Sequence, residues 1–348
     1  MTGFPGFIAA RLVARLANRD TQFFLLVQKN FIEKAMRDIE EVNQKTGTPL
    51  ENFALIEGDI TLENLGISRD DLEILRRETT DVYHLAAVYN LAVEKDLAFR
   101  VNVEGTRNVN EFVKTVPNLR RYNYVSTCYV SGNRTGVIYE MELEHDAGFR
   151  NFYEETKYLA EREVEQLKGE LPVTIFRPSV VVGDSQTGET VKYDGIYYLI
   201  NYLRMFPSLF RFVNVGNKDV KLNLVPIDFV VEGIAALAKD EKAIGKTIAL
   251  ADPNPLTTEE LFDAIAEVMT KKKSVIKPPP SLVEKTLMLP FSPVISGLPH
   301  SGVPYFFVPQ TYNTSTANEL LAAHDINCPN FKSYVENLLK FVEKNPRL

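Results

Sequence analysis

The sequence predicts an α/β protein built on a doubly wound parallel sheet, because short apolar runs alternate with amphipathic segments along its first half. A glycine-rich turn near the amino terminus leads straight into an amphipathic segment, which is typical of a phosphate-binding turn that opens a helix. The apolar runs lack strict alternation, as expected of parallel strands that are buried on both faces. After Gly183 the pattern loosens, which indicates a smaller carboxy-terminal lobe.

Bulk composition indicates a soluble globular protein. The chain has 348 residues, of which 45% are hydrophobic and 24% charged, so it can bury a sizeable core. A net charge of −7 gives no basis for nucleic-acid binding, which requires clustered positive charge. No apolar run is long enough to span a bilayer, and two cysteines provide no disulfide framework, so we expect a cytoplasmic protein. The four histidines show no metal-ligand spacing, and no metal is expected.

The glycine-rich turn occupies residues 2–9, with the sequence TGFPGFIA. Gly3 and Gly6 let the backbone turn tightly and approach a pyrophosphate, and Ala9 leaves room for the next helix to pack on the sheet. That helix runs to Leu16. A buried strand normally precedes such a turn, yet the chain begins at Met1. Either upstream residues are absent from this chain, which we favour, or the fold tolerates the gap.

Residues 22–27 predict the next buried strand, and Gln28 and Lys29 follow its end. At this position an acidic side chain selects NAD, whereas a cation accommodates the 2′-phosphate of NADP. Because Lys29 is the cation here, the sequence favours NADP(H), and NAD(H) stays open. The alternative is that Lys29 is simply solvated at the strand end.

The rest of the chain continues the alternation. We expect strands over 53–60, 81–87, 119–126 and 172–178, and helices over 31–43, from 102, over 153–167, over 228–237, over 258–269 and over 331–342. Asp228 is a candidate N-cap, and Thr257 and Glu260 have helix-start spacing. Residues 281–310 mix apolar, proline and glycine signals, which suggests a lid or rim over a pocket.

Tyr153 and Lys157 are four residues apart, so both side chains project from one face of a helix. An ammonium held close to a phenol lowers the phenol pKa, so we expect Tyr153 to exchange a proton with a carbonyl or alcohol oxygen. Thr127 ends an apolar stretch, and its hydroxyl could bind the same oxygen. If the Tyr153–Lys157 spacing is taken alone, the alternative is that both side chains are exposed on the helix surface and have no catalytic role.

With these motifs in order, the chain resembles the extended short-chain dehydrogenases/reductases. More narrowly, it resembles the branch of fatty acyl-CoA reductases (the male-sterility type) and thioester reductase domains. The resemblance runs roughly from Thr2 to Asp228. It rests on Thr-Gly-Phe-Pro-Gly-Phe, Gly58-Asp59-Ile60, His84-Leu85-Ala86-Ala87, Asn102-Val103-Glu104-Gly105-Thr106, Val125-Ser126-Thr127, Tyr153-x-x-x-Lys157, residues 177–184 (RPSVVVGD) and Val225-Pro226-Ile227-Asp228.

The resemblance implies a Rossmann-like domain over residues 1–183, with its first strand missing before Thr2, and a substrate lobe over 184–348, of which about 220–240 returns to the first domain. It implies that Thr127, Tyr153 and Lys157 are catalytic, and it selects Thr127 over Ser126 by the spacing to Gly132. The cofactor-binding positions that it implies are Gly3, Phe4, Pro5, Gly6, Phe7, Ile8, Gln28, Lys29, Asp59, Ile60, Leu85, Ala86, Ala87, Asn102 (a structural tie), Tyr153, Lys157, Pro178, Ser179 and Val180.

These residues imply an NADPH-dependent reductase of a carbonyl or an acyl thioester, the acyl group being carried on coenzyme A or a carrier protein. Three alternatives stay open: a sugar-nucleotide epimerase or dehydratase, a small-ketone reductase, and a non-catalytic NADP-binding sensor. The oligomeric state also stays open, a homodimer included.

One segment is either a wall for an acyl chain or ordinary core. It is the aromatic-rich stretch with Tyr193, Tyr197, Tyr198, Tyr202, Phe206, Phe210 and Phe212.

Overall fold

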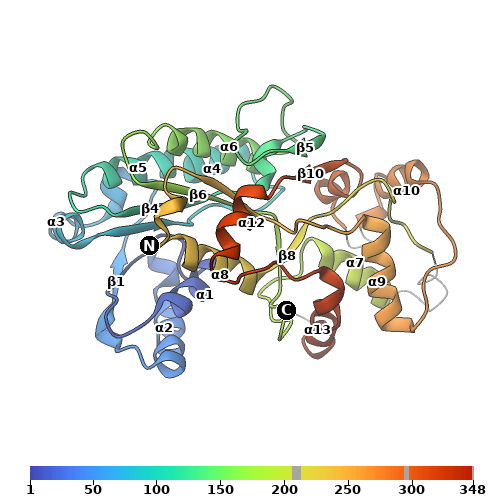
Figure 1. Cartoon of the computed structure of the whole chain (residues 1–348), viewed down its shortest axis with the longest axis horizontal. Coiled ribbons are helices and arrows are strands. Elements are labelled where there is room, and N and C mark those ends of the chain that lie inside the picture. Colours follow the sequence, from blue (N-terminus) through green and yellow to red (C-terminus); the bar gives the residue numbers. More distant parts are fainter. Residues whose placement is uncertain (206–212, 294–297, 347–348) are drawn as a thin grey trace.

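The protein is built on a parallel sheet with helices on both faces, and a second group of helices lies beside it (Figure 1). The computed structural model describes residues 1–205, 213–293 and 298–346. Every strand pair in it is parallel, which confirms the predicted fold class. Parallel strands need crossover connections, and here the helices provide them.

The main sheet consists of two groups of strands. Its larger group has the order β3-β4-β6-β9, and the smaller group pairs β1 with β2. Thr2 joins the two groups, because it forms single bridges to Leu26 of β1 and to His84 of β3. The strand bounds are β1 Phe23–Val27, β2 Phe53–Glu57, β3 Asp81–His84, β4 Arg121–Val125, β6 Val173–Pro178 and β9 Thr247–Leu250.

Helices on opposite faces of this sheet close two separate hydrophobic clusters. On one face α1 packs against α8 and α2, and α12 packs against α8 and β9. On the other face α5 packs against α6. Their bounds are α1 Phe7–Leu16, α2 Ile32–Thr46, α3 Arg69–Glu78, α4 Lys95–Ala98, α5 Gly105–Lys114, α6 Phe152–Glu165, α8 Ile227–Leu237 and α12 Ser315–Ala322.

The second group of helices has its own apolar cluster, in which α7, α9 and α13 meet. A short parallel pair, β7 with β8, connects this group to the main sheet, and β10 pairs with β5. The bounds are β5 Gly136–Ile138, β7 Val180–Val182, α7 Ile196–Met205, β8 Leu224–Pro226, α9 Thr258–Thr270, α10 Pro280–Leu287, η8 His300–Phe306, β10 Gln310–Tyr312 and α13 Phe331–Lys344.

Two sequence expectations are wrong in detail. Pro226, not Asp228, is the N-cap of α8; the Asp228 carboxylate accepts hydrogen bonds from the backbone N–H and the hydroxyl of Ser185. The helix expected from Asn102 begins earlier, since a π-helical stretch, η4 (Phe99–Glu104), precedes α5. In contrast, Thr257 and Glu260 form the expected capping box of α9. Of the aromatic stretch, Phe206, Phe210 and Phe212 lie outside the described residues.

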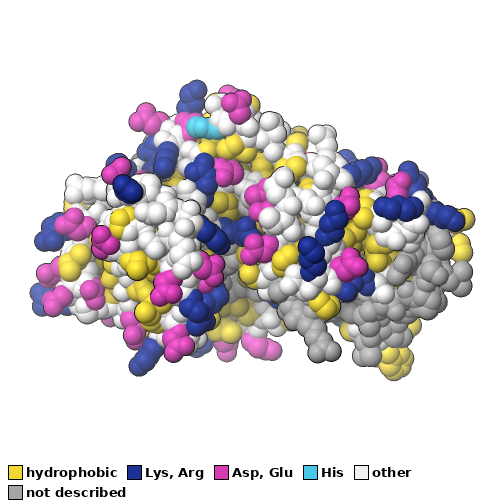
Figure 2. All heavy atoms as spheres, turned by 90° about the horizontal axis from the view of Figure 1, so that it is seen from below, with side chains coloured by type: hydrophobic (Ala, Val, Ile, Leu, Met, Phe, Trp, Pro, Cys, Tyr) yellow, Lys and Arg dark blue, Asp and Glu magenta, His cyan; other side chains and the backbone are white. Residues whose placement is uncertain are grey.

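The surface carries both signs of charge. Figure 2 shows Lys and Arg side chains interspersed with Asp and Glu side chains over one face of the molecule. Among the described residues, no helix combines the length and the apolar character needed to cross a bilayer. The same residues contain no cluster of three His, Cys, Asp or Glu side chains arranged to hold a metal ion.

Candidate active site

The glycine-rich turn lies against the carboxyl end of β3. Gly3 has a φ of +90°, and a Cβ atom there would lie 2.8 Å from the backbone of Leu85 and Ala86. A Cβ at Gly6 would lie 2.7 Å from the Gly3 carbonyl oxygen, which accepts the Gly6 N–H. Both positions therefore require glycine for steric reasons.

The same turn delivers the chain into α1 with its first N–H groups uncapped. Gly6 is the N-cap residue, and no side chain bonds the N–H groups of the first turn. Phe4 is buried in the apolar cluster beneath, so only its backbone faces the turn. Pro5, Phe7 and Ile8 complete this segment. An uncapped helix start next to two obligatory glycines fits the pyrophosphate of a dinucleotide.

At the end of β1, Gln28 and Asp59 are joined. Gln28 Nε2 donates to Asp59 Oδ2 at 2.8 Å, and Asp59 Oδ1 accepts the Thr61 N–H. Ile60 is buried beside Gly105, where a Cβ would lie 2.7 Å from its Cδ1. The structure therefore brings three of the predicted cofactor-binding residues, Gln28, Asp59 and Ile60, to one edge of the sheet.

Two lysines flank this edge. Lys29 is exposed at the start of the 3-10 turn η1 (Lys29–Phe31). Lys34 was not predicted; its ammonium donates to the Pro5 carbonyl at 2.6 Å and pairs with Asp38 at 2.8 Å. The available signal was its position one turn into the helix that follows β1. Two lysines thus lie near the end of β1 and the glycine-rich turn.

The exit of β3 is held by Asn102. Asn102 Oδ1 accepts the Val88 N–H at 2.8 Å, and its Nδ2 donates to the Thr156 hydroxyl at 2.9 Å. Leu85, Ala86 and Ala87 lie in the same exit, and the Leu85 N–H donates to the Thr2 carbonyl. Asn102 therefore ties this loop to α6, the structural role that the family resemblance implies.

His84 is a structural residue of this exit. It is fully buried, and its two ring nitrogens meet the hydroxyls of Thr2 at 2.7 Å and Thr106 at 3.0 Å. Burial, together with the nearby positive charge of Lys157 and the chain amino terminus, lowers the His84 pKa to about 3. The ring is therefore neutral at physiological pH.

Thr127 and Tyr153 meet at the carboxyl end of β4. Thr127 follows that strand, and Tyr153 lies in the first turn of α6, whose N-cap Asn151 accepts the Glu154 N–H. The Thr127 side chain lies close enough to Tyr153 to favour the ionised phenol. Burial raises the Tyr153 pKa to about 12, and the nearby Thr127 side chain only partly offsets this. The phenol is therefore protonated at neutral pH.

Lys157 lies in the same helix as Tyr153, but its ammonium forms hydrogen bonds with β4. Its ammonium donates to the Tyr124 hydroxyl and to the Val125 carbonyl, each at 2.9 Å. Burial lowers the Lys157 pKa to about 8, and Glu161 opposes that shift. Lys157 is not among the groups that shift the Tyr153 pKa. The expectation that Lys157 lowers the Tyr153 pKa is therefore wrong for this structure, where burial dominates.

A buried ion pair that the sequence interpretation missed supports this helix. Arg177 and Glu161 are both almost completely buried, and Arg177 Nη2 lies 2.5 Å from Glu161 Oε1. The Ser126 hydroxyl also donates to Glu161, and Arg177 Nη1 donates to the carbonyls of Glu140 and Glu142. Glu161 follows Lys157 by one helical turn, and that spacing was the available signal.

Aromatic side chains from distant segments surround Tyr153. The Tyr89 ring meets the Tyr153 ring edge-on, 5.7 Å away, and the Tyr89 hydroxyl donates to Asp194. From η8, the Tyr305 ring lies 4.5 Å from that of Tyr129, and its hydroxyl donates to Glu154 at 2.5 Å. Segments after residue 183 therefore lie beside the site. Tyr305 belongs to residues 281–310, the segment expected to form a lid or rim, whereas no sequence signal indicated Tyr89 or Asp194.

The loop after β6 faces the second group of helices. The Ser179 hydroxyl donates to Asn223 Oδ1 at 2.7 Å, and the Val180 N–H donates to the Asn223 carbonyl. Pro178 closes β6 directly before them. These three predicted residues therefore lie at the junction of the main sheet and the β7–β8 pair.

Comparison with known proteins places these features in context. The family described as male sterility protein matches residues 1–234. The chain is 27% identical over 279 residues to the fatty acyl-CoA reductase wat of Drosophila melanogaster, covering 69% of this chain and 53% of the relative. It is 23% identical over 349 residues to the probable fatty acyl-CoA reductase 4 of Arabidopsis thaliana, covering 79% and 71%. This chain thus spans about half the length of the Drosophila relative.

Solved structures share the fold. The terminal R domain from the myxalamid PKS-NRPS biosynthetic pathway superposes with a TM-score of 0.84 at 24% identity, covering 100% of this chain and 90% of that one. The UDP-glucuronic acid 4-epimerase from Bacillus cereus, in complex with NAD, superposes with a TM-score of 0.68 at 18% identity, covering 99% and 98%. Both likenesses concern the fold alone.

The buried ion pair generates a stability prediction. We expect Arg177→Met to lower the free energy of unfolding by about 3–5 kcal/mol, because it leaves the Glu161 carboxylate buried without its partner. The matched control is Arg107→Met, which removes the largely exposed pair with Glu163 and should cost about 0.2–1 kcal/mol. Urea unfolding measures both variants. Equal losses of unfolding free energy in the two variants would contradict the stabilising role of the buried Arg177–Glu161 pair.

Proposed function

Because this chain belongs to the male sterility protein family, we propose that it is an NADPH-dependent reductase of acyl thioesters. The observation that carries the proposal is that Thr127 and Tyr153 lie together at the sheet edge that also carries the glycine-rich turn. Fatty acyl-CoA reductases among the relatives support the thioester substrate. The acyl group would be carried on coenzyme A or on a carrier protein.

The residues around the turn fit a nicotinamide dinucleotide, which would supply a hydride to the carbonyl carbon when bound. Tyr153 donates the phenolic proton to the carbonyl oxygen, and Thr127 holds that oxygen by a hydrogen bond. Lys157 contributes positive charge near Thr127 and Tyr153 and would bind the nicotinamide ribose. Hydride and proton addition to a thioester gives a hemithioacetal, which collapses to an aldehyde and a free thiol.

An apolar cavity of about 400 Å³ supports an acyl substrate. It lies among α7, α9, α10 and η8, and no charged side chain lines it in the described part of the chain. Tyr198 and Tyr202 of the aromatic stretch are among its walls, which supports the acyl-wall interpretation of those two residues. A sugar nucleotide carries charged phosphates, for which the described residues of this cavity offer no cationic partner.

The segment η8 contacts both this cavity and the candidate active site. Phe306 of η8 lines the cavity, and the preceding residue, Tyr305, packs on Tyr129 and bonds Glu154 beside Tyr153. An acyl tail in the cavity would therefore bring its thioester end toward the Thr127–Tyr153 pair. The likeness to sugar-nucleotide epimerases concerns the shared fold, and the cavity favours the thioester reaction over that alternative.

For the cofactor, we propose NADP(H) rather than NAD(H). Lys29 is exposed at the end of β1, and Lys34 carries a second positive charge next to the glycine-rich turn. The carboxylate at this edge, Asp59, is already bonded by Gln28 and Thr61. The exposed Lys29 ammonium at the end of β1 supports recognition of a 2′-phosphate.

The catalytic assignment is tested by Tyr153→Phe. We expect kcat with acyl-CoA to fall by about 100-fold or more, because the proton donor is lost, while the Kd for NADPH stays within a factor of two of the parent. Tyr158→Phe is the matched control, since that hydroxyl bonds Glu144 away from the site. NADPH oxidation is followed with long-chain acyl-CoA, with aldehyde alone and with nucleotide sugars. Turnover of nucleotide sugars only would eliminate the thioester proposal.

The cofactor assignment is tested by Lys29→Ala. We expect NADPH affinity to fall about tenfold, which equals about 1.4 kcal/mol, while NADH affinity is unchanged, because only NADPH carries the 2′-phosphate. Lys45→Ala is the matched control, as Lys45 is an exposed lysine at the far end of the same helical region. Fluorescence titration measures all four affinities. An equal effect on both cofactors would refute the role of Lys29.

The pH dependence follows from Lys157. Its pKa of about 8 lies below the ordinary lysine value because of burial, so its positive charge is lost as the pH rises through 8. We expect kcat/KM for reduction to fall about tenfold per pH unit above 8, since Tyr153 stays protonated up to a pKa of about 12. In Lys157→Arg the fall should move to higher pH. A parent profile that stays flat to pH 10 would show that this charge is dispensable.

A further inference from the structure

The first turn of α6, which carries Tyr153, depends on support from outside the helix. Tyr153 is the second residue of α6, and Asn151 is its N-cap. The first four N–H groups of a helix have no carbonyl partner within it, and helix ends open more easily than the middle. A catalytic side chain, in contrast, has to stay within about 0.5 Å of its productive position. Contacts made to this turn from elsewhere in the fold therefore bear on the position of Tyr153.

Tyr305, from η8, makes three contacts with this turn. Its hydroxyl donates to Glu154 Oε1 at 2.5 Å and accepts the side-chain N–H of Asn151 at 2.8 Å. The Arg150 guanidinium lies over its ring, 5.3 Å from the ring centroid. One side chain thus contacts residues on both sides of Tyr153 in the sequence, although it is 151 positions away from Glu154.

The same ring also reaches the segment that carries Thr127. The Tyr305 and Tyr129 ring centroids are 4.5 Å apart, and the Tyr129 N–H donates to the Thr127 hydroxyl oxygen at 3.2 Å. Tyr129 belongs to the 3-10 turn η5 (Cys128–Ser131), which follows Thr127 directly. Tyr305 therefore contacts both of the segments from which Thr127 and Tyr153 project.

These contacts are buried, so the loss of a hydrogen-bond partner there is costly. Tyr305 is 8% exposed, and Glu154 is fully buried. The backbone N–H and the guanidinium of Arg150 also bond the Glu154 carboxylate, each at 3.0 Å. Without the Tyr305 hydroxyl, Glu154 would lose a donor and the Asn151 amide an acceptor. Burial is the main cause of the raised Tyr153 pKa and the charge of Glu154 adds to it, so a shift of this carboxylate would also act on Tyr153.

The position of Tyr305 is fixed by a strand pairing that follows it in the chain. After η8, β10 pairs in parallel with β5, and Gln310 lies opposite Gly136. The Gln310 side chain also donates to the Arg134 carbonyl at 2.9 Å. Because β5 lies shortly before α6 in the chain, this pairing holds η8 against the segments of the candidate site. Tyr305 is therefore a fixed support for the first turn of α6.

We propose that Tyr305 is a positioning residue of the candidate active site, which sets the separation of Thr127 and Tyr153 by contacting Tyr129 and the first turn of α6. The inference rests on the proposed reductase function and deepens it, since it assigns part of the catalytic geometry to η8. Tyr305 transfers neither proton nor hydride; it acts through Tyr153. A misplacement of about 1 Å can lower a rate about 100-fold, so the loss of some of these contacts should be visible in kcat.

The kinetic test compares Tyr305→Phe with the parent. This variant keeps the ring beside Tyr129 but loses both hydrogen bonds of the hydroxyl. We expect kcat for acyl-CoA to fall about tenfold, while KM and the Kd for NADPH stay within about a factor of two, because no binding contact is removed. Tyr158→Phe is the matched control and should keep the parent kcat, since it removes a hydroxyl of α6 that donates to Glu144 instead. An unchanged kcat in Tyr305→Phe would overturn the proposal.

A double-mutant cycle separates positioning from a general loss of structure. In Tyr153→Phe the proton donor that Tyr305 positions is absent, so adding Tyr305→Phe should lower the residual kcat less than about twofold. A further tenfold loss would show an independent effect and would refute the positioning role. The cycle is measured with acyl-CoA and with aldehyde. Turnover of aldehyde alone would eliminate thioester reduction, and the aldehyde cycle would still decide the role of Tyr305.

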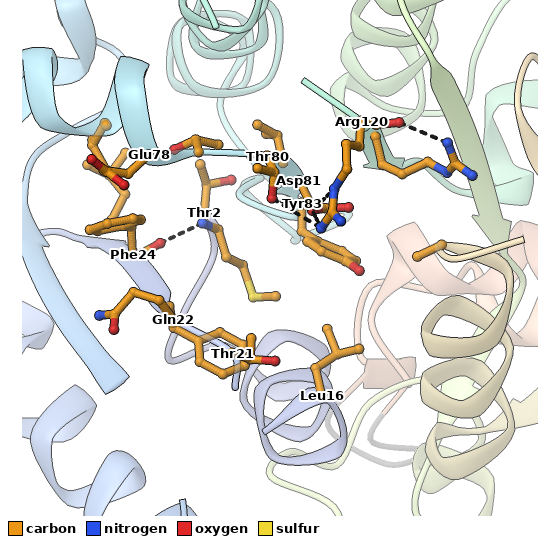
Figure 3. A pocket seen from close by; sticks show the side chains of 18 of the residues that line it. Thr2, Leu16, Thr21, Gln22, Phe24, Glu78, Thr80, Asp81, Tyr83 and Arg120 are labelled. Carbon is orange, nitrogen blue, oxygen red and sulfur yellow. Dashed lines mark hydrogen bonds and ion pairs between the residues drawn. The ribbon is translucent and has the colours of Figure 1, made fainter. Parts of the chain in front are cut away.

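Hydrogen exchange gives a readout that needs no turnover and is independent of the thioester proposal. The Glu154 N–H donates to Asn151 Oδ1 at 3.0 Å, and Tyr305→Phe should speed its exchange by about fivefold or more, because the N-cap loses its support. The control is Arg120→Gln, which removes an exposed ion pair with Asp81 at the opposite, amino end of the sheet (Figure 3). It should leave exchange at Glu154 as in the parent. Parent-like exchange in Tyr305→Phe would contradict the positioning role even if kcat falls.

Discussion

The contact between the Thr2–Gly6 turn and the exit of β3 is the constraint on which the site depends. Gly3 comes so close to the Leu85–Ala86 backbone that any side chain there would collide with it. This contact sets the direction of α1, keeps its first N–H groups open, and brings the turn next to the ends of β3 and β4, where Thr127 lies. Tyr153 and Lys157 then need only one helix, α6, placed over β4. The geometry of the candidate site thus depends on the close packing of the glycine-rich turn against the backbone of Leu85 and Ala86.

Most of the main sheet could be predicted from the sequence, because its strands are short apolar runs and its helices have an apolar periodicity. Elements of the second helical group were harder to predict. The strands β7 and β8 have three residues each, too short for a periodic signal, and they pair across a long intervening segment. Tyr89, Tyr129 and Tyr305 come together around Tyr153 from three distant segments. Their proximity is a property of the tertiary fold, which local patterns do not contain.

The Tyr153–Lys157 pair shows where local reasoning reaches its limit. A spacing of four correctly places both side chains on one face of α6, since that is a property of the helix alone. The direction of each polar tip depends on partners elsewhere. The Lys157 ammonium is drawn to the Tyr124 hydroxyl and the Val125 carbonyl of β4. Desolvation then decides the Tyr153 pKa, and a raised value suits a group that gives up a proton only when negative charge develops on a substrate oxygen.

The segment η8 has a consequence for how such a site could change over evolution. Tyr305 contacts α6 beside the reacting group, and its neighbour Phe306 forms part of the apolar wall. In the proposed function, selectivity for the tail of a substrate and alignment of its head would therefore depend on adjacent positions of one turn. A substitution in this wall that enlarges the cavity would also disturb the alignment of the substrate head. In the proposed function, new chain-length preferences should consequently arise more easily through α7, α9 or α10, which also line the cavity.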